Sequence, residues 1–346
     1  MAGIDMTDID MSEWQDCRPE IAQFWDRWPA FRTRVERARR TELDALGRHL
    51  DSAVELIDPR LCWELGKATS EWLLVVTANG DPQVRSTAER WLRAAPVPDP
   101  GWQFHCYRPA DRGALSGKLQ LGDGAVDLSD IRFKLDREFD QARIHVTVCH
   151  PGFATLEEDA RLQAVFMALD RTLGEDEVHR WIGDIDTSTS PGAEAVPATR
   201  LAAEVAGLAS AYAARKSVTL RDVAPDGLPV VTRTTVPMRP IDFPLYDQHV
   251  AITAGYLDAG ADRLPEASTV ARLQQFEDVL LAQTAGQAVL AGHETYNEHR
   301  IFHLYSDPAT DTAERLRAAL PPWLEGPFSV AVTLDPGWDE ISHFLA

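Results

Sequence analysis

Apolar residues in the first 60 positions recur at the spacing of helices. One set begins at Trp14 and another at Leu43, and each returns every three or four residues. Two helices are therefore predicted within residues 13–56. The pattern then changes to strands at 61–65 and 72–77, and the second is apolar throughout, which is typical of a strand buried on both faces.

The next elements follow in a strand–strand–helix–strand order. Asp81-Pro82 predicts a helix start, because Asp can cap free N–H groups and Pro lacks only an N–H that the first turn leaves unpaired. A strand over 102–107 completes the unit. The same order is predicted again, with a capping box of Thr155 and Glu158 opening the helix. The strands of this second unit are predicted at 131–135, 143–148 and 178–185.

The segment 187–197 is rich in Thr, Ser, Pro and Gly and predicts a linker, which an Ala-rich helix follows. Beyond it, the pattern predicts a helix at 268–283 and a helix opening at Asp307-Pro308. The predicted strands of this part are 228–236, 249–256, 287–293, 300–305 and 328–334.

Two segments share their spacing, which indicates an internal repeat. Asp81-Pro82 is followed by Thr87-Ala88-Glu89-Arg90, and Asp307-Pro308 by Thr312-Ala313-Glu314-Arg315. Each Asp-Pro lies twenty residues after the opening of its predicted hairpin. We therefore expect residues 61–107 to superpose on 287–334, although any two capped, Ala-rich helices also look alike.

These patterns predict an α+β fold of two domains built from duplicated ββαβ (ferredoxin-like) modules with antiparallel sheets. Its 346 residues suit two domains of ordinary size. We expect an N-terminal helical region at 1–60 that packs on the first domain. The first domain is expected at 61–186, a linker with the Ala-rich helix at 187–220, and the second domain at 221–346.

The net charge of the chain limits the classes of partner that it is expected to bind. Lys and Arg number 34 against 54 Asp and Glu, so the formal net charge is −20, which disfavours nucleic acid and anionic membranes as partners. The basic run 32–40 is interpreted as a solvated or internally paired helix face. The chain shows neither a signal peptide nor a membrane span, and we expect a cytoplasmic protein. The four Cys are far apart, which predicts no disulfide scaffold or zinc ribbon.

The stretch from Val270 to Leu345 resembles the bacterial domain of unknown function numbered 695, a relative of the regulator of ribonuclease activity B. An amphipathic helix, the aromatic strand 300–305 and the ending Asp335-Pro336-Gly337-Trp338 carry the resemblance. Ile341 departs from it, because a Tyr is expected there. Residues 60–186 look like uncharacterised actinobacterial-type hypothetical proteins. The resemblance implies a ferredoxin-like fold and no established activity.

Two groups of residues contain side chains that could form a chemical site. His293, Glu294, His299 and His303 lie on a predicted hairpin around Asn297-Glu298, but neighbouring strand residues face opposite ways, so we predict no metal site. A Cys/His pair for nucleophilic catalysis is not predicted either, because buried structural Cys are commoner than activated ones. The candidates for such a pair are His105, Cys106, His145, Cys149 and His150.

The sequence therefore predicts no catalytic residue, no bound metal and no cofactor, and none of the common nucleotide-binding or hydrolase motifs occurs. The leading hypothesis is a non-catalytic binding or regulatory protein that acts on a basic protein partner, in the manner of an inhibitor or immunity protein. An enzyme with an acid/base site in the inter-domain cleft is the alternative. A self-associating structural module is a third, and the oligomeric state is left open.

Overall fold

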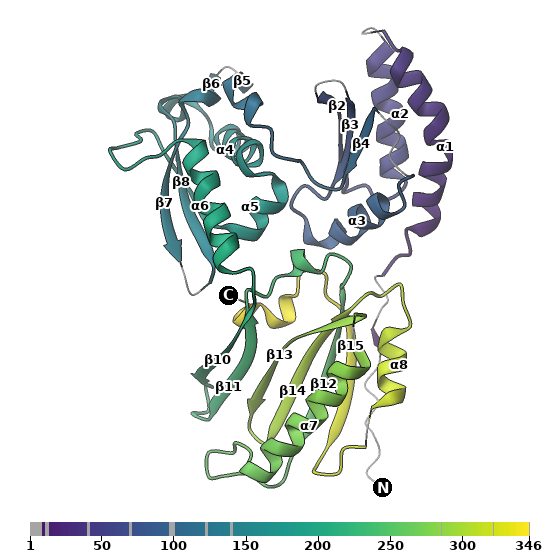
Figure 1. Ribbon diagram of the computed structural model, residues 1–346, viewed down its shortest axis with the longest axis vertical. Helices are drawn as coiled ribbons and strands as arrows, with labels where there is room; N and C mark the ends of the chain where they lie inside the picture. The colour runs from purple at the N-terminus through teal and green to yellow at the C-terminus, as the bar shows by residue number, and fades with distance from the viewer. Residues whose placement is uncertain are drawn as a thin grey trace. The chain divides into compact units, whose positions relative to one another are not determined.

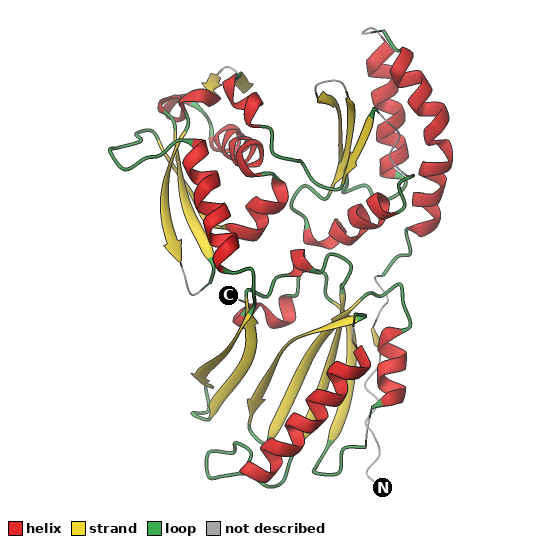
Figure 2. Ribbon diagram, in the orientation of Figure 1, coloured by secondary structure: helices red, strands yellow, loops and turns green. Residues whose placement is uncertain are grey.

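The computed structural model describes residues 9–10, 14–39, 42–68, 71–96, 101–121, 124–138, 141–284, 286–320 and 322–345. The chain forms two compact units (Figure 1). The N-terminal unit comprises residues 17–214. The C-terminal unit comprises residues 215–346 together with the short strand β1 (Ile9–Asp10). Both units combine helices with sheets (Figure 2), so the predicted α+β class is confirmed.

The N-terminal unit begins with two helices and a three-stranded sheet. Its sheet order is β2-β3-β4, and buried Leu74, Val75 and Val76 make β3 the apolar central strand that its sequence predicts. Trp25 of the first helix stacks on Trp91 at 4.8 Å. The elements are α1 (Arg18–Arg37), α2 (Leu43–Glu55), β2 (Cys62–Ala68), β3 (Glu71–Thr77), α3 (Arg85–Arg93) and β4 (Trp102–His105).

A second sheet of the same unit, ordered β7-β8-β9, packs with three helices. Residues 175–181 are helical, which corrects the strand predicted to begin at residue 178. The capping box is also wrong, because the Thr155 hydroxyl donates to the Gly152 carbonyl. The elements are β5 (Lys118–Leu121), β6 (Gly124–Asp127), β7 (Arg132–Glu138), β8 (Arg143–Cys149), α4 (Glu158–Leu173), α5 (Glu175–Trp181), β9 (Ile182–Ser188) and α6 (Ala198–Ala211).

These two three-stranded sheets are mixed, where purely antiparallel sheets were expected. β2 and β3 are antiparallel, as are β7 and β8, but β3 pairs in parallel with β4 and β8 in parallel with β9. The reason is the helical connection between the last two strands of each sheet. A crossover through a helix returns the chain in the same direction, so two neighbouring strands joined in this way are parallel.

The C-terminal unit contains a seven-stranded sheet in the order β1-β15-β12-β14-β13-β11-β10. β1 is added at one edge, parallel to β15, so this N-terminal strand lies in the C-terminal unit and not in the first domain. The other elements are β10 (Lys216–Val223), β11 (Pro229–Val236), β12 (Gln248–Gly255), α7 (Ala267–Thr284), β13 (Ala288–Tyr296), β14 (His299–Ser306), α8 (Thr312–Ala319) and β15 (Phe328–Leu334).

The two faces of this sheet differ. Alternate residues of β12 and β14, among them Ile252 and Phe302, form an apolar core with Leu273 and Phe276 of α7 and Leu316 of α8. We call the opposite side the distal face. Part of it is covered by a short C-terminal helix, η7 (Asp339–Phe344), and by a loop that carries Trp338.

The strand order does not support the duplication expected from the Asp-Pro spacing. In the N-terminal unit, β3 is hydrogen-bonded directly to β4. In the C-terminal unit β12 lies between β14 and β15. The two Asp-Pro pairs also act differently, since Asp81 caps a single turn (Pro82–Val84) directly before α3, whereas α8 begins only at Thr312.

Within the described residues, no helix combines the length and the apolar character that crossing a bilayer requires. The basic run 32–40 lies mostly on α1, where Arg32 pairs with Glu36 at 2.8 Å. Residue 40 lies outside the described residues, as do 1–8, 11–13 and 41 of the predicted N-terminal region.

Candidate functional site

The β13–β14 hairpin turns at Asn297-Glu298, where the sequence predicts it. Both residues have positive φ, 46° and 67°, which suits the tight turns that join two antiparallel strands. Strand alternation then separates the predicted histidine group. His293 faces α7, with Nδ1 3.1 Å from Glu277 Oε2, whereas Glu294 lies on the distal face.

Four side chains from four elements form a polar chain on the distal face, which we call the His–Glu chain. His249 of β12 lies with Nε2 3.0 Å from Nδ1 of His303 in β14, and the two rings are stacked. His303 Nε2 lies 3.4 Å from Glu294 Oε2. The other oxygen of Glu294 lies 2.8 Å from Nε2 of His343 in η7.

Proton positions in this chain follow from its partners. A carboxylate accepts, so the Nε2 atoms of His303 and His343 that face it carry protons. If His303 is neutral, its Nδ1 is an acceptor, and the proton between the two stacked rings lies on His249 Nε2. The contact of His303 Nε2 with Glu294, at 3.4 Å, is an ion-pair distance without hydrogen-bond geometry.

The environment fixes the charge of two members. Burial, with His303 nearby, lowers the pKa of His249 to about 3, so this ring is neutral at pH 7. Burial works to raise the pKa of Glu294, but contacts with His303 and His343 outweigh it and hold that pKa at about 2. Glu294 is therefore a fixed, half-buried carboxylate.

Glu294 also lines a groove of about 310 Å³ on the same face. One wall is apolar, with Val230 of β11 and Ile301 of β14. Tyr296 contributes a hydroxyl that donates to Asp226 at 2.5 Å. The full lining is Ala224, Val230, Thr253, Glu294, Tyr296, Asn297, His299 and Ile301. An aliphatic chain with a cationic end would match this combination of an apolar wall and a fixed carboxylate.

In the part of the chain that the structure describes, no three His, Cys, Asp or Glu residues are arranged to hold a metal ion. His299, the remaining predicted candidate, has its Nδ1 2.8 Å from the Asn297 carbonyl oxygen at the turn. The facing atoms of the His–Glu chain lie 3.0, 3.4 and 2.8 Å from one another.

The Cys/His candidates are dispersed. His145 lies between Glu138 and Asp184, at 2.8 and 3.3 Å, and His150 Nδ1 accepts from the Gly152 N–H. Burial raises the pKa of the Cys149 thiol. Burial and Glu89 likewise raise that of Cys106, which favours the unreactive thiol over the thiolate. His105 lies on β4, in a different sheet from His145.

A buried carboxylate at the start of α5 is bonded to β3 of the first sheet. Glu175 accepts from the Thr77 hydroxyl at 2.6 Å and from the Arg108 N–H at 2.9 Å. Burial and this carboxylate raise the pKa of nearby Asp170 to about 6, against the influence of Arg108. These contacts connect β3 to the start of α5.

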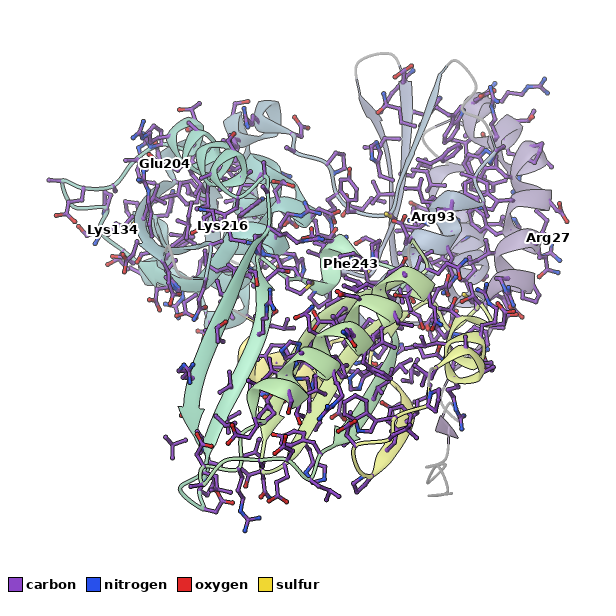
Figure 3. The ribbon with its side chains drawn as sticks, turned by 60° about the horizontal axis from the view of Figure 1, so that its bottom comes forward. Arg27, Arg93, Lys134, Glu204, Lys216 and Phe243 are labelled. Atoms are coloured by element: carbon purple, nitrogen blue, oxygen red, sulfur yellow. The ribbon has the colours of Figure 1, made fainter. Side chains whose placement is uncertain are left out.

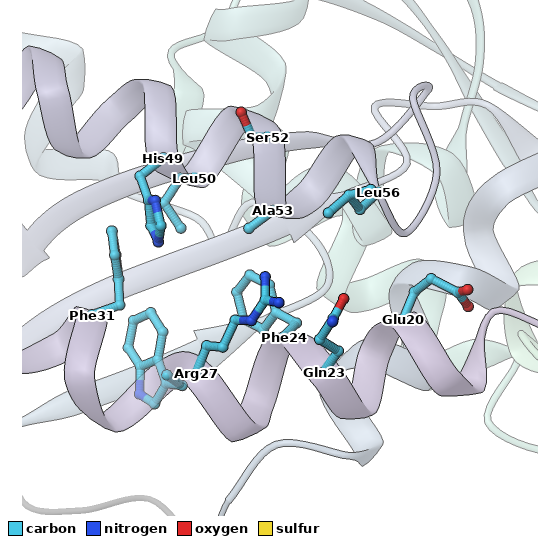
Figure 4. A pocket seen from close by; sticks show the side chains of 11 residues that line it. Glu20, Gln23, Phe24, Arg27, Phe31, His49, Leu50, Ser52, Ala53 and Leu56 are labelled. Carbon is cyan, nitrogen blue, oxygen red and sulfur yellow. The ribbon is translucent and has the colours of Figure 1, made fainter.

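A smaller hollow of about 70 Å³ lies between α1 and α2 (Figure 4). Phe31 of α1 stacks on His49 of α2 with ring centroids 5.4 Å apart. Phe24 of α1 and Leu50 of α2 line it from the two helices, and Arg27 extends from α1 toward it in Figure 4. This is a gap between packed helices, too small for more than a few atoms.

Sequence reasoning found Glu294 and His303 but missed His249 and His343. His249 is the second residue of β12, in which the alternate positions Val250, Ile252 and Ala254 are apolar, so alternation places it on the opposite face. What the sequence lacks is the strand order that makes β12 the neighbour of β14. His343 lies on η7, whose position depends on the packing of Trp338.

The comparisons with known proteins agree with this focus on the C-terminal unit. Residues 226–346 match the family of unknown function DUF695, which covers β11 to β15 and η7. The resemblance predicted for this end of the chain is therefore confirmed at the level of that family. Comparison with the curated proteins and with the solved structures gave no match.

Proposed function

We propose that this chain is a non-catalytic binding or regulatory protein that acts on a basic protein partner, in the manner of an inhibitor or immunity protein. The distal-face groove receives a Lys or Arg side chain of that partner. Its aliphatic stem lies along Val230 and Ile301, and its cation pairs with Glu294. The observation that carries this proposal is the fixed charge of Glu294 beside an apolar wall.

The overall charge supports the same partner. A net charge of −20 accelerates encounters with basic surfaces and slows those with nucleic acid and anionic membranes. We therefore expect an association rate that falls as salt rises. A cytoplasmic location belongs to the same proposal.

The sequence also left open an enzyme with an acid/base site. That alternative has less support than the binding function. A group that transfers protons near neutral pH works best with a pKa near that pH. The pKa values of about 2 for Glu294 and about 3 for His249 lie far below it. The His–Glu chain is better suited to holding a charge in place than to moving protons.

A second proposal concerns the fold and is more specific than the α+β class. We propose that the C-terminal unit is a ferredoxin-like domain related to the regulator of ribonuclease activity B. Its element order β12-α7-β13-β14-α8-β15, with β15, β12, β14 and β13 adjacent in that order, supports this. For residues 60–186, the relation to actinobacterial-type hypothetical proteins is proposed from the sequence alone.

The test is a titration of the full chain with a synthetic peptide rich in Lys and Arg. A peptide of equal length with Ser at every basic position is the ligand control. Glu294→Gln should weaken binding about tenfold, as expected for the loss of a charged hydrogen bond. Glu298→Gln, on the same hairpin but outside the groove lining, removes the same charge and should leave binding unchanged.

NMR chemical-shift changes should map to Val230, Ile301 and Tyr296. The proposal is contradicted if Glu294→Gln binds as tightly as the wild type while its thermal unfolding is unchanged. Equal binding of the Ser peptide would also contradict it.

A further inference from the structure

β10 is the outermost strand of the C-terminal sheet, and no strand within the described residues pairs with its outer edge. Its eight residues pair with β11 in one continuous register, from Lys216 opposite Val236 to Val223 opposite Pro229. Only Val218 is partly buried, and the other residues are exposed. The strand contains neither a proline nor a bulge, two devices that protect sheet edges.

The sequence of β10 is self-complementary about Thr219. If two copies run antiparallel with this residue opposite itself, every other residue faces the one equally far on the other side. The facing pairs are then Val218 with Leu220, Lys216 with Asp222, and Ser217 with Arg221. An apolar pair is thus flanked by an opposite-charge pair, and both kinds of cross-strand pair are stabilising.

We propose that β10 pairs with the β10 of a second copy of this chain, in the antiparallel register centred on Thr219. The two sheets then form one continuous sheet of twice seven strands, and the exposed edge disappears. Leu220, with 41% of its surface exposed, becomes covered by Val218 of the second copy. Figure 3 shows Lys216 at the start of this strand.

Neighbouring registers are disfavoured. A shift by one residue in one direction sets Lys216 against Arg221, and in the other direction it sets Val218 against Arg221. Either shift also places the face with Val218 and Leu220 on the same side as the polar face of the second copy. The occupant is therefore another copy of the chain, whose complementary strand is supplied by symmetry. This inference is independent of the groove and its proposed partner.

A cross-link tests the register. Thr219→Cys places two Cys directly opposite each other, at the 4.5–5.5 Å Cα separation, roughly, of antiparallel neighbours, which suits a disulfide. Mild oxidation of the full chain should give a covalent dimer that reductant cleaves. Arg221→Cys, two residues along the same face, would lie opposite Ser217 and should give little dimer, as should the wild type. Equal cross-linking of both variants would overturn the register.

A charge exchange tests the pairing without relying on one variant. Sedimentation velocity should detect a dimer of the wild type that dissociates on dilution. Asp222→Lys alone, or Lys216→Asp alone, should raise the dimer dissociation constant about tenfold, since each sets two like-charge pairs across the interface. The double variant Lys216→Asp, Asp222→Lys should restore dimerisation. A wild type that stays monomeric at its highest soluble concentration, or a double variant weaker than both single variants, would overturn the proposal.

Discussion

The indole ring of Trp338 stacks on the phenol ring of Tyr305, with centroids 4.1 Å apart and an interplanar angle of 17°. Asp335 holds the same loop, because it accepts from the Tyr305 hydroxyl at 2.6 Å and from the N–H of Asp339. Tyr305 also stacks on His249. The Asp-Pro-x-Trp ending therefore fixes the loop before η7, and η7 carries His343 to Glu294.

Trp338 should be an anchor for stability, because only 1% of its surface is exposed. It adopts a left-handed backbone conformation, φ 57°, which is costly for a residue other than glycine. Two contacts offset that cost: the ring stacks on Tyr305, and the indole N–H donates a hydrogen bond to the Tyr246 carbonyl. Trp338→Ala should lower the free energy of unfolding by about 3–5 kcal/mol.

Urea unfolding monitored by circular dichroism measures this change. Leu324→Ala is the matched control, because Leu324 is 85% exposed and should be tolerated. An unchanged unfolding midpoint for Trp338→Ala would contradict the anchoring role.

His249 should make stability depend on pH. Its pKa is about 3 in the folded protein and 6.5 when exposed, so between these values the unfolded chain takes up a proton that the folded one does not. Stability is therefore lost as pH falls below about 6.5. Between pH 7 and pH 5 this loss amounts to about 2 kcal/mol.

The measurement is urea unfolding of wild type and His249→Gln at both pH values. The variant cannot titrate at this position, so it should lose about 2 kcal/mol less than the wild type over that interval. Parallel losses in the two proteins would mean that His249 is protonated as readily when folded as when unfolded.

Glu175 should control the acidity of Asp170. Burial and the Glu175 carboxylate together raise the pKa of Asp170 to about 6. Glu175→Gln keeps an acceptor for the Thr77 hydroxyl and removes the negative charge, so the pKa of Asp170 should fall. Carboxyl-carbon NMR titration reads this directly. Glu177→Gln removes a charge from the same helix and should leave Asp170 unchanged; a fall in both variants would refute the specific coupling.

The thiols of Cys106 and Cys149 should be unreactive in the folded protein. Burial raises both pKa values, and Glu89 adds to the effect at Cys106. Alkylation by iodoacetamide at pH 8, followed by peptide mass spectrometry, should therefore modify half-buried Cys62 first. The same reaction in urea should modify all four Cys. Rapid modification of Cys106 in the folded chain would reopen the case for thiol chemistry.

Local pattern determined much of the fold. The last strand is 328–334, as predicted, and the hairpin turns at Asn297-Glu298, as its residues demand. Prediction failed where the periodic signal of a segment is short. Seven of the eight residues of β10 are exposed, and its sequence alternates only around Val218 and Leu220, so the pattern predicts no strand there. The pattern predicts a strand over residues 178–181, but they complete the short helix α5.

In the candidate site too, the sequence determined some features and the tertiary structure decided others. Alternation along β13 was enough to separate His293 from Glu294 and so to argue against a metal site. Only the tertiary structure placed β12 between β14 and β15, which set His249 beside His303 and ruled out the simple repeat. The physical reason is that periodicity records which face of an element is buried, a property of neighbours in the chain. Strand order depends on the packing of whole elements far apart in sequence, and no local run of residues encodes it.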